Sequence, residues 1–85
     1  MKGTRVFANE KGYFPQLQPG EYAYSPIFRK WEICSPTGAR CSLGPHKITE
    51  HDDGTITASP SILTTEREHG KAWHGYLEHG QWRTV

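Results

Sequence analysis

The stretch HKITEHDDGTITAS, residues 46–59, decides the predicted fold, because it reads as two strands joined by a tight turn. Apolar and polar residues alternate on both sides of an Asp-Asp-Gly sequence, which is the pattern of a β-hairpin. A two-residue Asp-Gly turn would put Ile48 and Ile56 on opposite faces. A three-residue loop over 52–54 pairs Ile48 with Ala58 instead and gathers the apolar residues on one face, so we favour this register.

Two further hairpins flank the first. The stretch RKWEICSPTGARCSL, residues 29–43, has proline and glycine where a type I turn prefers them, and its Trp and Ile alternate with polar neighbours, so both should face inward. In AWHGYLEHGQWRTV, residues 72–85, a tight His-Gly turn pairs Leu77 with Trp82. One face of this hairpin then carries Trp73, Leu77 and Trp82, and the other carries His74, Tyr76 and Arg83.

The remaining segments add little regular structure. Residues 1–20 read as an irregular lead-in, and PQLQPGEYAYSP, residues 15–26, suits an edge strand or a loop lying across a sheet. TTEREHG, residues 64–70, fits a single helical turn between a threonine N-cap and a glycine stop. We therefore predict one all-β domain over 1–85 with its β core at 21–85. Six to seven short antiparallel strands would form a curled sheet, a small barrel or a sandwich.

The composition limits the classes of function. The chain has 85 residues and a formal net charge of +1, and its Lys and Arg form no run, so no bulk attraction to nucleic acid or to a membrane is indicated. No apolar stretch is long enough to span a membrane, and the first residues lack the apolar middle of a signal peptide, which favours a cytoplasmic protein. In that compartment we expect Cys34 and Cys41 to remain reduced.

Five histidines raise the question of a metal site, but no Cys-x-x-Cys or His-Glu-x-x-His spacing is present. His46 and His51 would meet within one hairpin, and His69 or His74 would supply a third ligand. Solvent-exposed turn histidines are the simpler interpretation, so we expect no metal and no other cofactor. Aromatic residues beside basic ones also permit base stacking, but a domain of this size needs most of its aromatics for the core.

A serine at the end of the central hairpin is the candidate nucleophile. Such a group needs a base within hydrogen-bond reach, a group that orients the base, and an oxyanion hole. Pro60 has no main-chain N–H to donate to a neighbouring strand, so the regular pairing ends there. Ser61 can then direct its hydroxyl at a neighbouring strand. His74 is the candidate base, and Gly75 beside it would allow close approach of a substrate. The acids available to orient the imidazole are Glu50, Asp52 and Asp53.

The segments GPHKITEHDDGTITASPSILTT and WHGYLEHGQWRTV resemble a family of small proteins from bacteria, phages and prophages, over roughly residues 20–85. The shared features are an acidic Asp-Gly-Thr hairpin that runs into Ser-Pro-Ser-Ile, a Trp-His-Gly segment and a closing Trp. Some members are similar to the BubE-type serine peptidases of bacterial ubiquitin-like operons, which process or remove the modifier. The resemblance implies that Ser61 is the nucleophile and His74 the general base, and Asp53 is our preferred orienting acid. Longer members carry a cysteine-rich segment that two isolated cysteines do not reproduce.

The expected protein is therefore a phage- or prophage-type hydrolase in the cytoplasm of a bacterial host cell, with a ubiquitin-like modifier as its protein partner. Substrate contacts would come from Gly75, Tyr76 and Arg83. The alternative is a non-enzymatic accessory protein that binds or sequesters a host defence protein or a small signalling nucleotide through this same surface. A phage structural or assembly protein is the simplest option. An exposed edge strand near Tyr22–Tyr24 would also permit a homo-oligomer.

Overall fold

The computed structural model describes residues 1–65 and 71–85, and within them the chain forms strands, turns and loops without a helix. The strands make two four-stranded sheets, in the orders β1-β2-β3-β4 and β5-β6-β7-β8. The all-β prediction is confirmed, with eight strands divided between two sheets. Their bounds are β1 Thr4–Arg5, β2 Glu21–Ser25, β3 Lys30–Cys34, β4 Arg40–Ser42, β5 Lys47–Glu50, β6 Ile56–Thr64, β7 Trp73–Glu78 and β8 Gln81–Thr84.

The helical turn predicted for 64–70 falls mainly on residues 66–70, which lie outside the described residues. In the part of the chain that the structure describes, no helix has the length and apolarity needed to cross a membrane.

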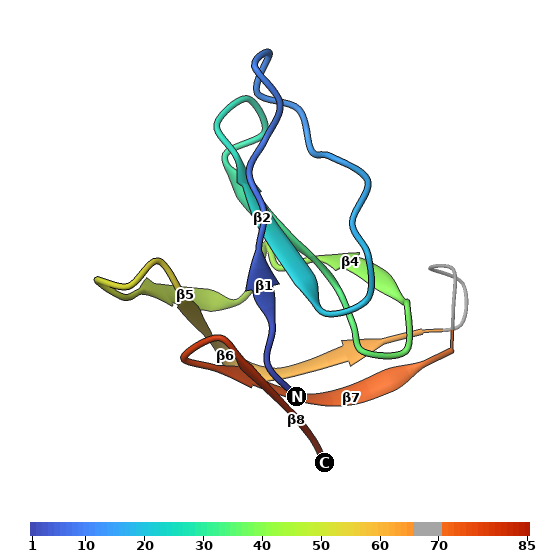
Figure 1. Cartoon of the computed structure of the whole chain (residues 1–85). Coiled ribbons are helices and arrows are strands. Elements are labelled where there is room, and N and C mark those ends of the chain that lie inside the picture. The colour runs from blue at the N-terminus through green and yellow to red at the C-terminus, as the bar shows by residue number, and fades with distance from the viewer. Residues whose placement is uncertain (66–70) are drawn as a thin grey trace.

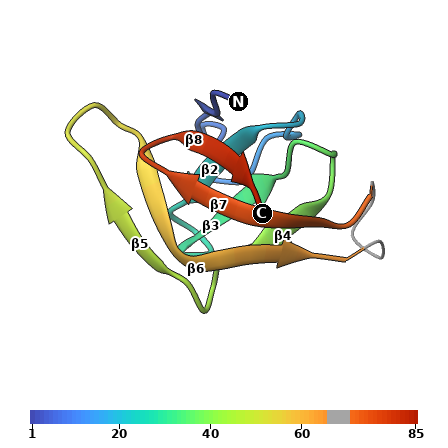
Figure 2. The ribbon, with the colours of Figure 1, turned by 90° about the horizontal axis from the view of Figure 1, so that it is seen from below.

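The two sheets cross one another and enclose a shared apolar core (Figures 1 and 2). Trp73 and Trp82 meet edge to face in this core, with ring centroids 5.4 Å apart. The Trp82 indole N–H also donates to the carbonyl of Gly20 at 2.9 Å, so the ring that fills the core ties the sheets together. The first sheet and the turn after it contribute Tyr22, Trp31, Ile33 and Leu43, and the second contributes Ile56, Ala58, Ile62, Trp73, Leu77 and Trp82.

The registers of the hairpins agree with the sequence patterns. Ile48 pairs with Ala58, as the three-residue loop requires, and Gly54 in that loop has a φ of 85° that favours glycine. Leu77 pairs with Trp82 across the β7–β8 turn. In the β3–β4 turn the N–H of Gly38 donates to the carbonyl of the serine three residues earlier, at 2.9 Å. The alternation of apolar residues therefore specified which face of each hairpin is buried.

The first residues, predicted as an irregular lead-in, connect the two sheets. Lys2 forms a bridge with Gln81 of β8, and the N–H of Gly3 donates to the carbonyl of Gly80 at 2.7 Å. The chain then continues into β1, which pairs in parallel with β2. Because β2 lies between β1 and β3, the exposed edge strand predicted near Tyr22–Tyr24 is wrong.

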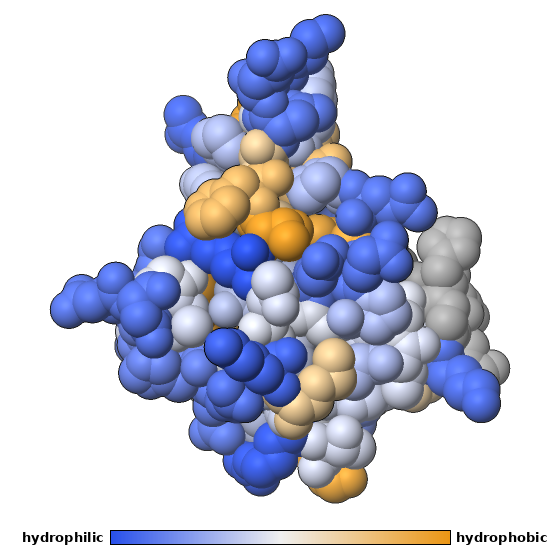
Figure 3. All heavy atoms as spheres, in the orientation of Figure 1, coloured by the Kyte–Doolittle hydropathy of each residue, from blue (hydrophilic) through white to orange (hydrophobic). Residues whose placement is uncertain are grey.

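The face seen in Figure 3 is mainly hydrophilic, with apolar side chains gathered over β2. Phe28, in the turn after β2, is half exposed and stacks on Phe14 with ring planes 5° apart. Tyr13 contacts the same ring at a centroid distance of 5.9 Å. This aromatic group covers the upper end of the first sheet and lies outside the main core.

Candidate functional site

A β-bulge in β6 creates the candidate site. Ala58 pairs with Leu77 and Ile62 pairs with Gly75, so residues 59–61 of β6 lie opposite the single residue Tyr76 of β7. Extra residues on one strand bend it and redirect their side chains, and β6 bends sharply at this place in Figure 2. The bulge contains the Ser59–Pro60 peptide bond, which is cis, and Ser61 follows it directly. The abrupt Ser-Pro-Ser sequence therefore marks a change in strand direction.

The bulge brings Ser61 and His74 together. The Ser61 Oγ lies 3.0 Å from Nε2 of His74, within hydrogen-bond distance. His74 is on the exposed face of β7, whereas Trp73 and Gly75 on either side of it are buried. Strand alternation thus holds the imidazole outside the core, where the serine hydroxyl reaches it from the adjacent strand. The predicted contact between these two residues is present.

A second histidine, which the sequence analysis did not connect with the serine, lies on the other side of Ser61. The Nε2 of His46 is 3.1 Å from the main-chain carbonyl oxygen of Ser61. A carbonyl oxygen only accepts hydrogen bonds, so Nε2 of His46 carries the proton and donates it. The other ring nitrogen, Nδ1, is buried without a hydrogen-bond partner among the described residues. The pairing of Lys47 with Ser59 is the signal for this contact, since it places His46 beside the bulge.

Asp53 lies elsewhere, at the tip of the β5–β6 hairpin. Its Oδ1 accepts hydrogen bonds from the hydroxyl and the N–H of Thr55, at 2.6 and 3.0 Å, and its Oδ2 is 3.7 Å from Nε2 of His79. The Thr55 hydroxyl is the main reason that the pKa of Asp53 is below its ordinary value. His79 and His74 are five residues apart, which is roughly 16 Å along an extended strand. The placement of Asp53 therefore gives no support to its assignment as the acid that orients His74.

No other described acid takes that role. In residues 1–65 and 71–85, no carboxylate forms an ion pair with His74. Glu50, one of the alternatives, pairs with Arg5 at 2.7 Å. The geometry is that of a Ser–His pair whose imidazole is oriented by the strand that carries it.

Gly75 has a packing role. It is buried on the inner face of β7, and a Cβ there would overlap the Trp73 indole ring and the carbonyl oxygen of Arg83. The absence of a side chain makes room for the tryptophan, as glycine does where another group approaches the backbone closely. The expectation that Gly75 admits a substrate is not supported, because this residue faces the core and His74 faces outward.

Tyr76 and Arg83 lie on the same outer face as His74. They are direct cross-strand partners, and the Arg83 guanidinium carbon is 4.4 Å from the centroid of the tyrosine ring. The Arg83 Nη2 also lies 2.9 Å from Oε1 of Glu78. The guanidinium thus lies over the tyrosine ring and is ion-paired with a carboxylate on one exposed surface.

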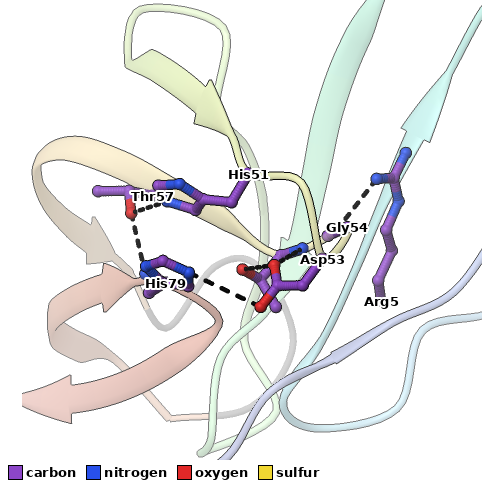
Figure 4. A network of polar contacts seen from close by, with 7 residues as sticks. Arg5, His51, Asp53, Gly54, Thr57 and His79 are labelled. Atoms are coloured by element: carbon purple, nitrogen blue, oxygen red, sulfur yellow. Dashed lines mark hydrogen bonds and ion pairs between the residues drawn. The ribbon is translucent and has the colours of Figure 1, made fainter.

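Two more histidines form a separate polar cluster at the tips of the second sheet's hairpins (Figure 4). The rings of His51 and His79 stack with centroids 3.9 Å apart and planes 2° apart. Thr57 joins them, since its Oγ1 contacts Nε2 of His51 at 2.7 Å and accepts the main-chain N–H of His79 at 2.9 Å. Beside the cluster, a groove of about 670 Å³ runs between the two hairpin tips and the N-terminal segment.

Arg5 forms one wall of this groove and has a structural role there. Its Nη1 donates to the carbonyl of Gly54 at 3.1 Å, and its guanidinium carbon lies 4.8 Å from the ring centroid of Trp31. The side chain therefore fastens the β5–β6 tip to the first sheet (Figure 4).

The described histidines are dispersed. Among residues 1–65 and 71–85 there is no group of three or more His, Cys, Asp or Glu arranged to hold a metal ion. His46 contacts the bulge and His51 contacts His79, at opposite ends of β5, so these two do not meet. His69 lies outside the described residues.

No protein-family model matches the chain, and neither a curated protein nor a solved structure matches it with statistical significance. The geometry around Ser61 is thus the basis for a functional proposal.

Proposed function

We propose that this chain is a serine hydrolase in which Ser61 is the nucleophile and His74 the general base. The observation that carries the proposal is the 3.0 Å separation of the Ser61 Oγ and the His74 Nε2. A serine hydroxyl is a weak nucleophile unless a base within this distance accepts its proton as it attacks. The pair is exposed on the outer face of β6 and β7, where a substrate can reach it.

The reaction would be acyl transfer followed by hydrolysis. The Oγ of Ser61 bonds to the carbonyl carbon of a peptide or ester while His74 Nε2 takes the hydroxyl proton. The bond from that carbon to the leaving nitrogen or oxygen then breaks, and the imidazolium returns the proton to the leaving group. A water molecule attacks the acyl-serine in the same way, with His74 again as base, and releases the acid and the free serine.

Two features support an ordered nucleophile and a modest rate. The hydrogen bond from His46 holds the main chain of Ser61, so the hydroxyl stays near the imidazole. The described residues supply no carboxylate to His74, and loss of that carboxylate in a serine protease lowers kcat by about 10⁴. We therefore expect slow turnover with an easily trapped acyl-enzyme. Roughly residues 20–85 resemble a family of small bacterial and phage proteins, some members of which are similar to BubE-type peptidases. This resemblance would make a ubiquitin-like modifier the natural substrate.

Fluorophosphonate labelling followed by intact-mass analysis tests the proposal. Wild type should gain one adduct, located at Ser61 by peptide mapping, and His74→Ala should lose it. Ser59→Ala is the matched control, because Ser59 is an exposed serine of the same bulge and its removal should leave labelling unchanged. The Ser–His mechanism would be rejected if the folded wild type gained no adduct, or if His74→Ala still gained the adduct.

Binding without chemistry is the second candidate function. The stacked Tyr76 and Arg83 form a surface next to His74 that suits a planar or anionic group of a host defence protein or a signalling nucleotide. This function would tolerate Ser61→Ala and would be weakened by Tyr76→Ala or Arg83→Ala. Hydrolysis requires the Ser61 hydroxyl itself, so Ser61→Ala separates the two candidates.

A further inference from the structure

The β6 strand has an open edge next to the Ser–His pair. Its pairing with β5 ends where Lys47 meets Ser59, whereas β6 itself continues to Thr64. On the opposite side, β7 pairs with β6 up to Thr64 and Trp73. Within the described residues, the part of β6 that follows the bulge therefore has a strand neighbour on one side only.

Among the described residues, the main-chain groups without a strand partner on this edge are those of Leu63. The carbonyl of His74 accepts the N–H of Val85 at 3.0 Å, so the main-chain groups of His74 point toward β8. Leu63 is the direct partner of His74 on β6. In an antiparallel pair that is not joined by hydrogen bonds, the main-chain groups of both residues point away from each other. The N–H and C=O of Leu63 therefore lie in the plane of the sheet and point away from β7, toward the open edge.

The side chain of Leu63 is also available. It is 68% exposed, although most large apolar side chains of this sheet are in the core. It shares the outer face of β6 and β7 with His74, its cross-strand partner. An apolar side chain, an unpaired main-chain donor and acceptor, and a serine hydroxyl thus occur within three consecutive residues of one strand, 61–63.

We propose that this edge binds the substrate as an added β-strand: an extended peptide segment pairs with the main chain of Leu63 and places an apolar side chain against it. Only a backbone in the extended conformation presents a donor and an acceptor at the spacing that a strand edge requires. The inference rests on the proposed function, because it puts the scissile carbonyl beside Ser61. It restricts the substrate to peptides with an apolar residue and excludes small esters as preferred substrates.

Peptide binding to the Ser61→Ala chain tests the docking mode without any turnover. The probe is a fluorescein-labelled octapeptide of alternating leucine and threonine, capped at both ends and followed by fluorescence anisotropy. N-methylation at successive positions removes one donor at a time. We expect Kd to rise by about threefold to tenfold at the one position whose N–H donates to the Leu63 carbonyl, the cost of one lost hydrogen bond, and to stay constant at the other positions. Equal sensitivity at all positions, or no binding, would overturn the proposal.

Variants of Leu63 separate the main-chain contact from the side-chain contact. Leu63→Ala removes the apolar group, and Leu63→Pro also removes the edge N–H, which takes no part in the β6–β7 ladder. We expect weaker peptide binding for Leu63→Ala and a further loss of about threefold to tenfold for Leu63→Pro. Ile27→Ala is the matched control, since Ile27 is 50% exposed in a turn of the other sheet, and it should bind as before. If Leu63→Pro fails to fold, the N-methyl series decides alone.

Fluorophosphonate labelling distinguishes this inference from the proposed function. Labelling at Ser61 without octapeptide binding would support the hydrolase proposal and overturn the proposal that the substrate adds as a β-strand. Octapeptide binding that is sensitive to N-methylation at one position, without labelling at Ser61, would support the docking edge and reject the nucleophile. A dimer that excludes the octapeptide and dissociates in Leu63→Pro would identify a second copy as the occupant and overturn the proposal.

Discussion

The main-chain carbonyl of Ser61 accepts a hydrogen bond from Nε2 of His46 at 3.1 Å. This contact joins the residue before β5 to the bulge of β6, next to the hydroxyl that meets His74. It holds the backbone of the proposed nucleophile from the side opposite to the proposed base. His46 is thus a positioning residue that touches the main chain and not the reacting atoms.

His46→Ala should slow fluorophosphonate labelling of Ser61, because a displaced nucleophile loses alignment with its base; a shift of about 1 Å costs on the order of 100-fold in rate. His46→Gln keeps a side-chain N–H donor and should recover most of the rate. The second-order labelling rate constant is the measurement, with tryptophan fluorescence as the check on folding. Equal rates in both variants and wild type would show that the contact does not position Ser61.

Gly75→Ala should destabilise the fold strongly. The new methyl group would overlap the Trp73 ring and the carbonyl of Arg83, and overpacking of a core costs roughly 1–3 kcal/mol. Gly44→Ala is the control, since the nearest atom to a Cβ there is the Ser42 hydroxyl oxygen at 3.7 Å, an ordinary contact. Urea unfolding measures the free energy of unfolding of both variants. A free energy of unfolding for Gly75→Ala within about 0.5 kcal/mol of wild type, the usual range of a neutral surface substitution, would contradict the packing role.

The sequence predicted those parts of the fold in which local pattern and turn chemistry act together. The register of Ile48 with Ala58 follows from the loop length and the need to bury one face, and it is confirmed. The pairing of residues near position 2 with β8 could not be predicted in this way. Lys2 and Gln81 are far apart in the sequence, and no turn residue marks their bridge.

The candidate site was likewise predictable only where it depends on strands that follow one another in the chain. Ser61 and His74 lie on strands adjacent in the chain, so their contact follows from hairpin order once the bulge is recognised. The role of Asp53 could not be predicted, because an aspartate before glycine fits a turn residue and a catalytic acid equally well in sequence. The structure shows the turn function, with both Thr55 donors bound to one carboxylate oxygen. His46 was missed because its partner is a main-chain carbonyl, so that only the register of Lys47 with Ser59 indicates that the two lie close together.

Acid should weaken the fold in part through Asp53. Hydrogen bonds from Thr55 lower the pKa of this carboxyl below its ordinary value of 3.8, so the folded state favours the ionised form. The stabilisation is complete above the ordinary pKa and is lost as pH falls through the lower pKa of the folded state. Asp53→Asn lacks this dependence. Urea unfolding at a series of pH values should therefore show wild type losing its advantage over Asp53→Asn below about pH 4. A stability difference that stays constant from neutral pH to about pH 2 would contradict the assignment.

Alkali should weaken the fold through Tyr22. Burial is the main cause that raises the pKa of its phenol above the ordinary value of 10.0, because the core disfavours the phenolate. The unfolded chain therefore loses this proton at lower pH than the folded chain. The contribution to stability is complete below the ordinary pKa and declines as pH rises above it.

Tyr22→Phe isolates this effect, since it keeps the ring in the core and removes the titrating hydroxyl. Wild type should lose stability relative to Tyr22→Phe between about pH 9 and 11, in urea unfolding experiments at matched ionic strength. Ultraviolet absorbance at equilibrium supplies the second readout, because the Tyr22 phenol of the folded wild type should ionise above its ordinary pKa of 10.0. Parallel stability curves for the two proteins across this range would show that the Tyr22 phenol titrates alike in the folded and unfolded states. In that case water reaches the core between the sheets more easily than the 1% exposure of the Tyr22 side chain indicates.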